Sequence, residues 1–207
     1  MLKLGVLASG RGSNLEAIIQ NIESGRLSAK IQVVISDHPD ASALKRAREH
    51  EIEAVYLPPG KHKTYLDPDV EKSYVDCLID HGVELVVLAG FMRVLKSHFL
   101  NSFQGKIMNI HPALLPSFRG LEAQRQALEY GVKYTGCTVH FVTEDIDGGP
   151  IILQAVVPIL PGDTVEILSE RVLKEEHRIY SEAIQLYSEG RLQVDERRVI
   201  IKMQNAK

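Results

Sequence analysis

The chain has 207 residues, of which 44% are hydrophobic, and a formal net charge of −3. This length and composition suit one globular domain with a sizeable core, and the charge argues against broad electrostatic capture of nucleic acid. The two cysteines, Cys77 and Cys137, have no metal or redox spacing, so we expect a cytoplasmic, reducing location. The apolar run Leu2–Leu7 is too short for a signal peptide or a membrane helix, and we expect no membrane association.

Short apolar, β-branched runs alternate with helical patterns along the chain, which is typical of βαβ units and a mostly parallel, twisted sheet. The predicted strands are Leu4–Ala8, Ile31–Ser36, Ala54–Leu57, Leu85–Ala89, Ile107–Ile110, Cys137–Val142 and Ile151–Val157. The first predicted helix begins at Ser13 with a capping box over Ser13–Glu16, two more helices cover roughly Ala41–His50 and Val70–His81, and the last helix follows a capping box at Asp163–Glu166. Val194–Ile201 has the pattern of an edge hairpin. Because the linkers are short, we expect a single domain over residues 1–207.

A glycine turn follows the first predicted strand and opens the first helix. Gly10 and Gly12 let the backbone approach a ligand closely, while Ser13 and Asn14 add a hydroxyl and an amide. Free N–H groups and the positive end of the helix dipole favour a phosphate here. The alternative is a plain turn with Ser13 as the N-cap. A dinucleotide fingerprint is less favoured because Leu15 replaces its third glycine.

An amide and an imidazole lie two residues apart at the end of a predicted strand. Asn109 and His111 leave the same face because side chains alternate along a strand, and Pro112 ends the strand because it has no N–H. Ligands bind at the carboxyl ends of strands in open α/β sheets. Alone, either residue suits a structural role, but the pair favours a function.

A second cluster follows about thirty residues later in the sequence. Thr138 and His140 share a strand face, and the role of His140 is open between structure and function. Asp147 precedes two glycines, a common turn setting, but a turn that brings it to His111 would orient the ring and raise its pKa. No histidine or cysteine spacing predicts a metal site, and Ser117 has no nucleophile elbow around it.

The apolar stripe of the last predicted helix contains one carboxylate, Glu176. A buried carboxylate requires a partner, which is a cation either of this chain or of a ligand. The two alternatives are equally favoured.

Several segments together resemble the glycinamide ribonucleotide (phosphoribosylglycinamide) formyltransferases of the formyl-folate transferase superfamily. They are Gly12–Asn14, Ala89–Leu95, Asn109–Pro112, Leu114–Phe118, Thr138–Val142 and Asp147–Ile152. The Asn-x-His-Pro and Asp-Gly-Gly-Pro motifs in this order are specific to the superfamily, which also includes methionyl-tRNA formyltransferases and formyltetrahydrofolate deformylases with additional domains.

The resemblance implies a Rossmann-like α/β fold of about seven strands with helices on both faces, nucleotide-phosphate binding in the N-terminal part, and folate binding and catalysis in the C-terminal part. It assigns residues to three groups: catalytic Asn109, His111 and Asp147; substrate-binding Gly12, Ser13, Asn14 and Glu176; and folate-binding Met92, Arg93, Val94, Leu95, Thr143, Glu144, Asp145 and Ile146. Three departures from the family pattern are Ala113 for serine, Arg119 for proline, and Lys61–Lys63 where an arginine often reaches the phosphate.

The implied reaction moves the formyl group of 10-formyltetrahydrofolate, a co-substrate, to the amine of glycinamide ribonucleotide in de novo purine biosynthesis. Asn109 and a protonated His111 would donate to the developing oxyanion, and Asp147 would hold His111 charged. We expect small-molecule substrates, no metal, no nucleic acid or membrane partner, and a monomer or homodimer. Two alternatives are a formyltetrahydrofolate hydrolase and a non-catalytic nucleotide-binding module.

Overall fold

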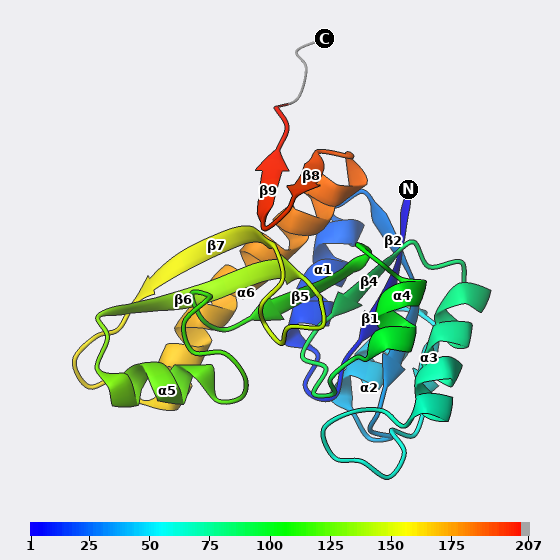
Figure 1. Ribbon diagram of the computed structural model, residues 1–207, viewed down its shortest axis with the longest axis horizontal. Coiled ribbons are helices and arrows are strands. Elements are labelled where there is room, and N and C mark those ends of the chain that lie inside the picture. The colour runs from blue at the N-terminus through cyan, green and yellow to red at the C-terminus, as the bar shows by residue number, and fades with distance from the viewer. Residues whose placement is uncertain (204–207) are drawn as a thin grey trace. The chain divides into compact units, whose positions relative to one another are not determined.

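The computed structural model describes residues 1–203, and the chain divides into two compact units, Met1–Asn109 and Ile110–Lys207. Strand β5 (Ile107–His111) crosses the junction between them (Figure 1).

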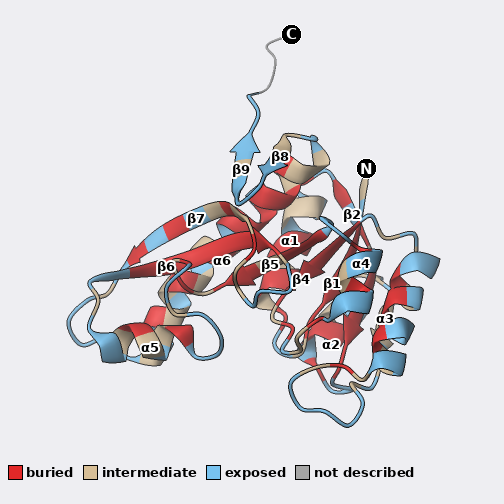
Figure 2. Cartoon of the chain, viewed as in Figure 1, coloured by how far each residue is buried: buried red, intermediate tan, exposed pale blue. Residues whose placement is uncertain are grey.

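The first unit is built on parallel strands with alternating helices. The strand order is β3-β2-β1-β4-β5, and every strand pair is parallel. The strands are β1 (Leu2–Leu7), β2 (Ala29–Ser36), β3 (Ala54–Tyr56), β4 (Leu85–Leu88) and the start of β5; the helices are α1 (Ser13–Glu23), α2 (Ser42–Glu49), α3 (Pro68–Asp80) and α4 (Ser97–Ser102). All four residues of β4 are buried, as Figure 2 shows by colour, because a central parallel strand is covered on both faces.

The second unit combines antiparallel and parallel pairing. Strand β6 (Tyr134–Phe141) pairs antiparallel with β7 (Ile151–Pro158), β7 pairs parallel with β9 (Arg198–Ile201), and β9 forms a hairpin with β8 (Leu192–Asp195). The helices are α5 (Ala123–Tyr130) and the long α6 (Val165–Ser188), which packs against β6 and β7. The apolar stripe of α6 therefore covers one face of these strands.

The mixed α/β class and the mostly parallel sheet predicted from the sequence are confirmed. The described residues form nine strands rather than about seven, because the predicted hairpin near the C-terminus adds β8 and β9. Helices α4 and α5 were not predicted. Each buries at most two side chains, Phe99 in α4 and two alanines in α5, so neither has a strong apolar stripe.

Both predicted capping boxes are wrong in detail. The N-cap of α1 is Gly12 in the left-handed conformation, and no side chain caps this helix, although Ser13 was the expected cap. In α6 the cap is Thr164, whose hydroxyl accepts from Ile167 N at 3.3 Å. Asp163 instead accepts two hydrogen bonds from Arg171, at 2.6 and 2.8 Å, because a guanidinium offers a bidentate partner.

No helix within residues 1–203 is both long and apolar enough to cross a membrane.

Candidate active site

His111 is the last residue of β5, where Pro112 stops the strand. The ring is buried, with 4% of the residue exposed, and both of its nitrogens face oxygen atoms. Nε2 lies 2.8 Å from the carbonyl oxygen of Phe118, and Nδ1 lies 3.4 Å from Oδ2 of Asp147. The second unit therefore brings together two residues, His111 and Asp147, that the sequence predicted to interact.

Asp147 occupies a tight turn that only the two glycines after it permit. Its own φ is 50°, in the left-handed region. A Cβ on Gly148 would lie 1.8 Å from Oδ2 of Asp145, and one on Gly149 would lie 1.8 Å from the carbonyl oxygen of Phe141. The glycines thus allow the chain to pass close to β6 and point the carboxylate at His111.

His140 is the second imidazole next to Asp147. It is 2% exposed, with Nε2 at 3.7 Å from Oδ1 of Asp147 and Nδ1 at 2.9 Å from the Phe141 carbonyl oxygen. Gly120 N also donates to Oδ2 of Asp147, at 2.8 Å. The Asp147 carboxylate therefore lies between two buried rings and accepts a backbone hydrogen bond. The sequence left the role of His140 open, and the signal for it was its position on the Thr138 face of β6.

The electrostatics of this cluster correct one expectation. Burial lowers the pKa of His111 below its ordinary value and outweighs the raising effects of Asp147 and of the Phe118 carbonyl. The imidazole is therefore mainly neutral at pH 7, whereas we expected Asp147 to hold it charged. A neutral ring that bonds to the Phe118 carbonyl carries its proton on Nε2, so this nitrogen is the donor.

Asp147 remains ionised in this setting. Burial alone would raise the pKa of its carboxyl, but hydrogen bonds from His140 and from Gly120 N, together with the charge of His111 when it is protonated, hold that pKa below its ordinary value. The cluster combines a carboxylate with two imidazole rings, and these are the side-chain types that most often transfer protons in enzymes.

A buried hydroxyl network fixes the chain that leaves His111. Thr138 Oγ1 donates to the Ala113 carbonyl at 2.7 Å and accepts from Leu115 N at 3.1 Å. Gln154 Nε2 donates to Thr138 Oγ1 and to the Leu115 carbonyl, both at 3.0 Å. Gln154 was not predicted, since nothing in the sequence indicates which β7 residue faces Thr138.

Two further predicted site residues are Asn109 and Glu176. Asn109 is partly exposed on β5, two residues before His111. Glu176 is buried on α6, and after burial its charge is the largest cause that raises the pKa of Cys137 to about 12. Because Cys137 lies on β6, this effect shows that Glu176 is near β6. Its predicted contact with a substrate amine stays a prediction.

A cavity of about 270 Å³ lies beside Asp147, and Leu115, Ile151, Arg119 and Arg197 help to line it. Arg119 NH1 lies 3.1 Å from Oδ1 and 3.2 Å from Oδ2 of Asp145, so the residue that departs from the family pattern joins two loops of the site.

In the first unit the predicted phosphate turn leads directly into α1. Gly12 has φ 73°, and a Cβ there would lie 2.8 Å from Cα of Ala43, so only glycine fits. No side chain caps the first turn of α1, and the positive end of the helix dipole lies at this turn. Arg46, on α2, holds the turn in place, because its Nε donates a hydrogen bond to the Arg11 carbonyl oxygen at 3.0 Å.

The predicted folate-binding residues fall into both units. Met92–Leu95 follow β4 in the first unit, and Thr143–Ile146 follow β6 in the second. Of the three candidates for the missing arginine, His62 is engaged with Asp67, at 3.1 Å, and is stacked on Tyr65. Within residues 1–203, no group of three or more His, Cys, Asp or Glu side chains is placed to hold a metal ion.

The chain is thus an α/β protein in which one carboxylate and two imidazole rings form a cluster. A sequence model of the formyl transferase family matches residues 2–184. The chain therefore belongs to the formyl transferase family.

Relatives of known name support this assignment. The phosphoribosylglycinamide formyltransferases of Haemophilus influenzae and Escherichia coli are 44% and 40% identical, over 94% of this chain and 91% of each relative. The human trifunctional purine biosynthetic protein adenosine-3 is 45% identical over 94% of this chain, which spans only 19% of that protein.

Solved structures are similar as well. Glycinamide ribonucleotide transformylase 1 from Symbiobacterium toebii superimposes with a TM-score of 0.94 at 52% identity, covering 98% of this chain and 95% of that one. A formyltetrahydrofolate deformylase from Pseudomonas syringae has a TM-score of 0.90 at 26% identity, and this chain covers 66% of it.

Proposed function

We propose that this protein transfers the formyl group of 10-formyltetrahydrofolate to the amine of glycinamide ribonucleotide in purine biosynthesis. The observation that carries the proposal is the pair formed by the buried His111, at the end of a strand, and Asp147 at 3.4 Å, in a chain of the formyl transferase family. Relatives named for this transfer match nearly their whole length to this chain.

In this proposal the substrate amine attacks the formyl carbon, and the carbonyl oxygen becomes an oxyanion. Asn109 and the Nε2–H of His111 donate to that oxygen, which requires His111 to exchange its bond with the Phe118 carbonyl. Asp147 accepts the proton that the attacking nitrogen loses, directly or through a water molecule, and the folate nitrogen leaves with a proton. The amine is itself the nucleophile, so no covalent enzyme intermediate is needed.

The binding residues follow the same proposal. The turn Gly12–Asn14 binds the substrate phosphate, Glu176 contacts the amine, and Met92–Leu95 and Thr143–Ile146 bind the folate. We propose a single formyltransferase domain, since the family match crosses the junction between the two units. The free thiols Cys77 and Cys137 support a reducing, cytoplasmic location, and we propose a monomer or homodimer without nucleic-acid or membrane partners.

Hydrolysis of the formyl-folate is the second candidate, favoured by the structural similarity to a deformylase. Water would then replace the amine as nucleophile at the same cluster.

One assay separates these reactions. The enzyme receives 10-formyltetrahydrofolate with a labelled formyl group together with glycinamide ribonucleotide, methionyl-tRNA or no acceptor. We expect label only on the ribonucleotide. Release of labelled formate without an acceptor would favour the hydrolase, and label on methionyl-tRNA alone would contradict the proposal.

A further inference from the structure

A second buried carboxylate lies at a strand end of the first unit. Asp37 directly follows β2, and its side chain is fully buried. Oδ2 accepts from Nε of Arg93 at 2.7 Å, and the Arg93 side chain is 11% exposed. Oδ1 is buried and, among the described residues, has no hydrogen-bond partner. Arg93 is therefore the near partner of the Asp37 carboxylate, and Nε2 of the exposed His38 lies farther from Oδ2, at 3.8 Å.

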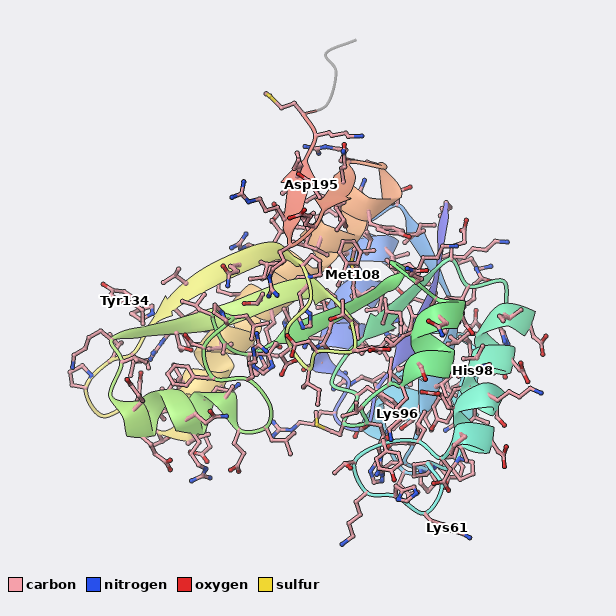
Figure 3. The ribbon with its side chains drawn as sticks, viewed as in Figure 1. Lys61, Lys96, His98, Met108, Tyr134 and Asp195 are labelled. Atoms are coloured by element: carbon pink, nitrogen blue, oxygen red, sulfur yellow. The ribbon has the colours of Figure 1, made fainter. Side chains whose placement is uncertain are left out.

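Arg93 uses its remaining donors on the loop between β3 and α3. NH1 donates to the His62 carbonyl at 3.0 Å and also to the Lys63 carbonyl. The same loop and Arg93's neighbours meet at two further points, where Val94 N donates to the Thr64 carbonyl at 2.8 Å and Lys96 Nζ lies 3.4 Å from the centre of the Tyr65 ring. Figure 3 labels Lys96 and, at the outer end of this loop, Lys61.

The ion pair spans the ends of three adjacent strands. The order is β2-β1-β4, with Asp37 after β2 and Arg93 after β4. Between them, after β1, Ser9 Oγ accepts from Met92 N at 2.9 Å. The segment Met92–Leu95 is thus tied on one side to the turn that precedes α1 and on the other to Asp37.

We propose that Asp37 is a positioning residue for the formyl-folate, acting through Arg93. The inference rests on the proposed function, in which Met92–Leu95 bind the folate. The carboxylate fixes the plane of the guanidinium, so that the guanidinium holds both carbonyls of the loop and the Met92–Leu95 backbone keeps one conformation before the folate arrives. Asp37 itself touches neither reacting group.

The test separates positioning from mere stability. Asp37→Asn leaves a buried guanidinium with a weaker partner and is expected to lower the melting temperature. The double variant Asp37→Leu with Arg93→Met removes both buried charges with side chains of similar size, which is often neutral for stability. It also removes the donors to the two loop carbonyls, so the positioning is lost while the fold is kept.

We expect Asp37→Asn, which leaves Arg93 in place, to raise KM for 10-formyltetrahydrofolate by about tenfold while KM for glycinamide ribonucleotide stays within about twofold, since lost preorganisation weakens the binding of one substrate only. The double variant should melt near the parent temperature and raise KM for the folate by a similar factor, which separates the effect from loss of stability. Asp163→Asn, which breaks the Asp163–Arg171 pair at the start of α6, is the matched control and should leave both KM values unchanged.

Unchanged KM for the folate in the folded double variant, or an equal rise for both substrates, would overturn the inference. In either case the parent enzyme still transfers formyl groups, so the proposed function stands. Absence of formyl transfer by the parent enzyme would instead refute the proposed function.

Discussion

Each unit places a carboxylate at the end of a strand or in the turn after it, and the two carboxylates differ in their partners. Asp147 in the second unit lies between His111 and His140, whose ring nitrogens are 3.4 and 3.7 Å away. Asp37 in the first unit holds the guanidinium of Arg93 at 2.7 Å. Imidazoles gain and lose protons near neutral pH, whereas a guanidinium does not. The first arrangement therefore suits proton transfer, and the second suits a fixed framework.

The largest effect is expected when His111, the proposed oxyanion donor of the Asp147 cluster, is removed. His111→Ala should lower kcat by about 10²–10³-fold, the usual consequence of removing an oxyanion donor. Asn109→Ala should lower kcat in the same way, and the two decreases should not add, because both donors are proposed to bond to one oxygen. Steady-state rates of both single variants and the double variant test this prediction.

The exposed His98→Ala variant is the control for loss of a histidine away from the cluster, and it should keep full activity. A His111→Ala variant with near wild-type kcat would remove His111 from the reaction centre.

A smaller effect is expected in the glycine turn. Gly12→Val would force a branched residue into φ 73°, with its Cβ 2.8 Å from Cα of Ala43. It should strongly weaken the binding of glycinamide ribonucleotide and leave the binding of the folate unchanged. Ser13→Ala should weaken the binding of the ribonucleotide less, because the backbone N–H groups of the turn are kept. Calorimetric titration with each substrate separately is the measurement, and equal weakening of both would indicate a misfolded turn.

The contrast also shows what the sequence could reveal. His111 and Asp147 were predicted to interact because a motif and an alternating strand pattern identify them locally. The Asp37–Arg93 pair was not, since its two residues are far apart in the sequence and no periodicity relates the ends of β2 and β4. Its only signal was an acidic residue directly after a buried strand.

Errors in the predicted elements have similar physical causes. Helix α5 was missed because it buries only Ala123 and Ala127, too few apolar side chains for a helical period. The Ser13 cap was wrong because Gly12 adopts the left-handed conformation and becomes the N-cap itself. His111 was expected to be charged because a sequence reveals the neighbouring carboxylate but not the depth of burial.

Buried histidines predict a dependence of stability on pH. Burial lowers the pKa of His111 and of His177 in the folded protein, so the unfolded chain binds more protons below its ordinary histidine pKa of about 6.5. The contribution of these two histidines to the free energy of unfolding should be constant above that pH, fall as the pH drops from there to the lowered values, and level off below them. Urea titrations at pH 7, 6 and 5 measure it, and His177→Leu should reduce the slope of the free energy of unfolding against pH. An unchanged slope would contradict a lowered pKa for the partly buried His177.

The smallest effect is expected at the loop contact that departs from the family pattern. Arg119→Ala removes an exposed ion pair with Asp145, and exposed pairs contribute little. We expect KM for the folate to rise by about twofold, with the difference from the parent vanishing at high salt as screening weakens the pair. Arg125→Ala, which removes the exposed pair with Glu122, is the control; a salt-independent effect of Arg119→Ala would exclude the ion pair as its cause.

The most direct test of the account is the pKa of His111, measured by NMR titration in the parent enzyme and in Asp147→Asn, with the pH–rate profile recorded in parallel. Loss of the carboxylate should lower the His111 pKa further, decrease kcat and change the acidic side of the profile, because Asp147 is the group that raises that pKa. An unchanged His111 pKa together with an unchanged profile would contradict the claim that these two residues form the reaction centre.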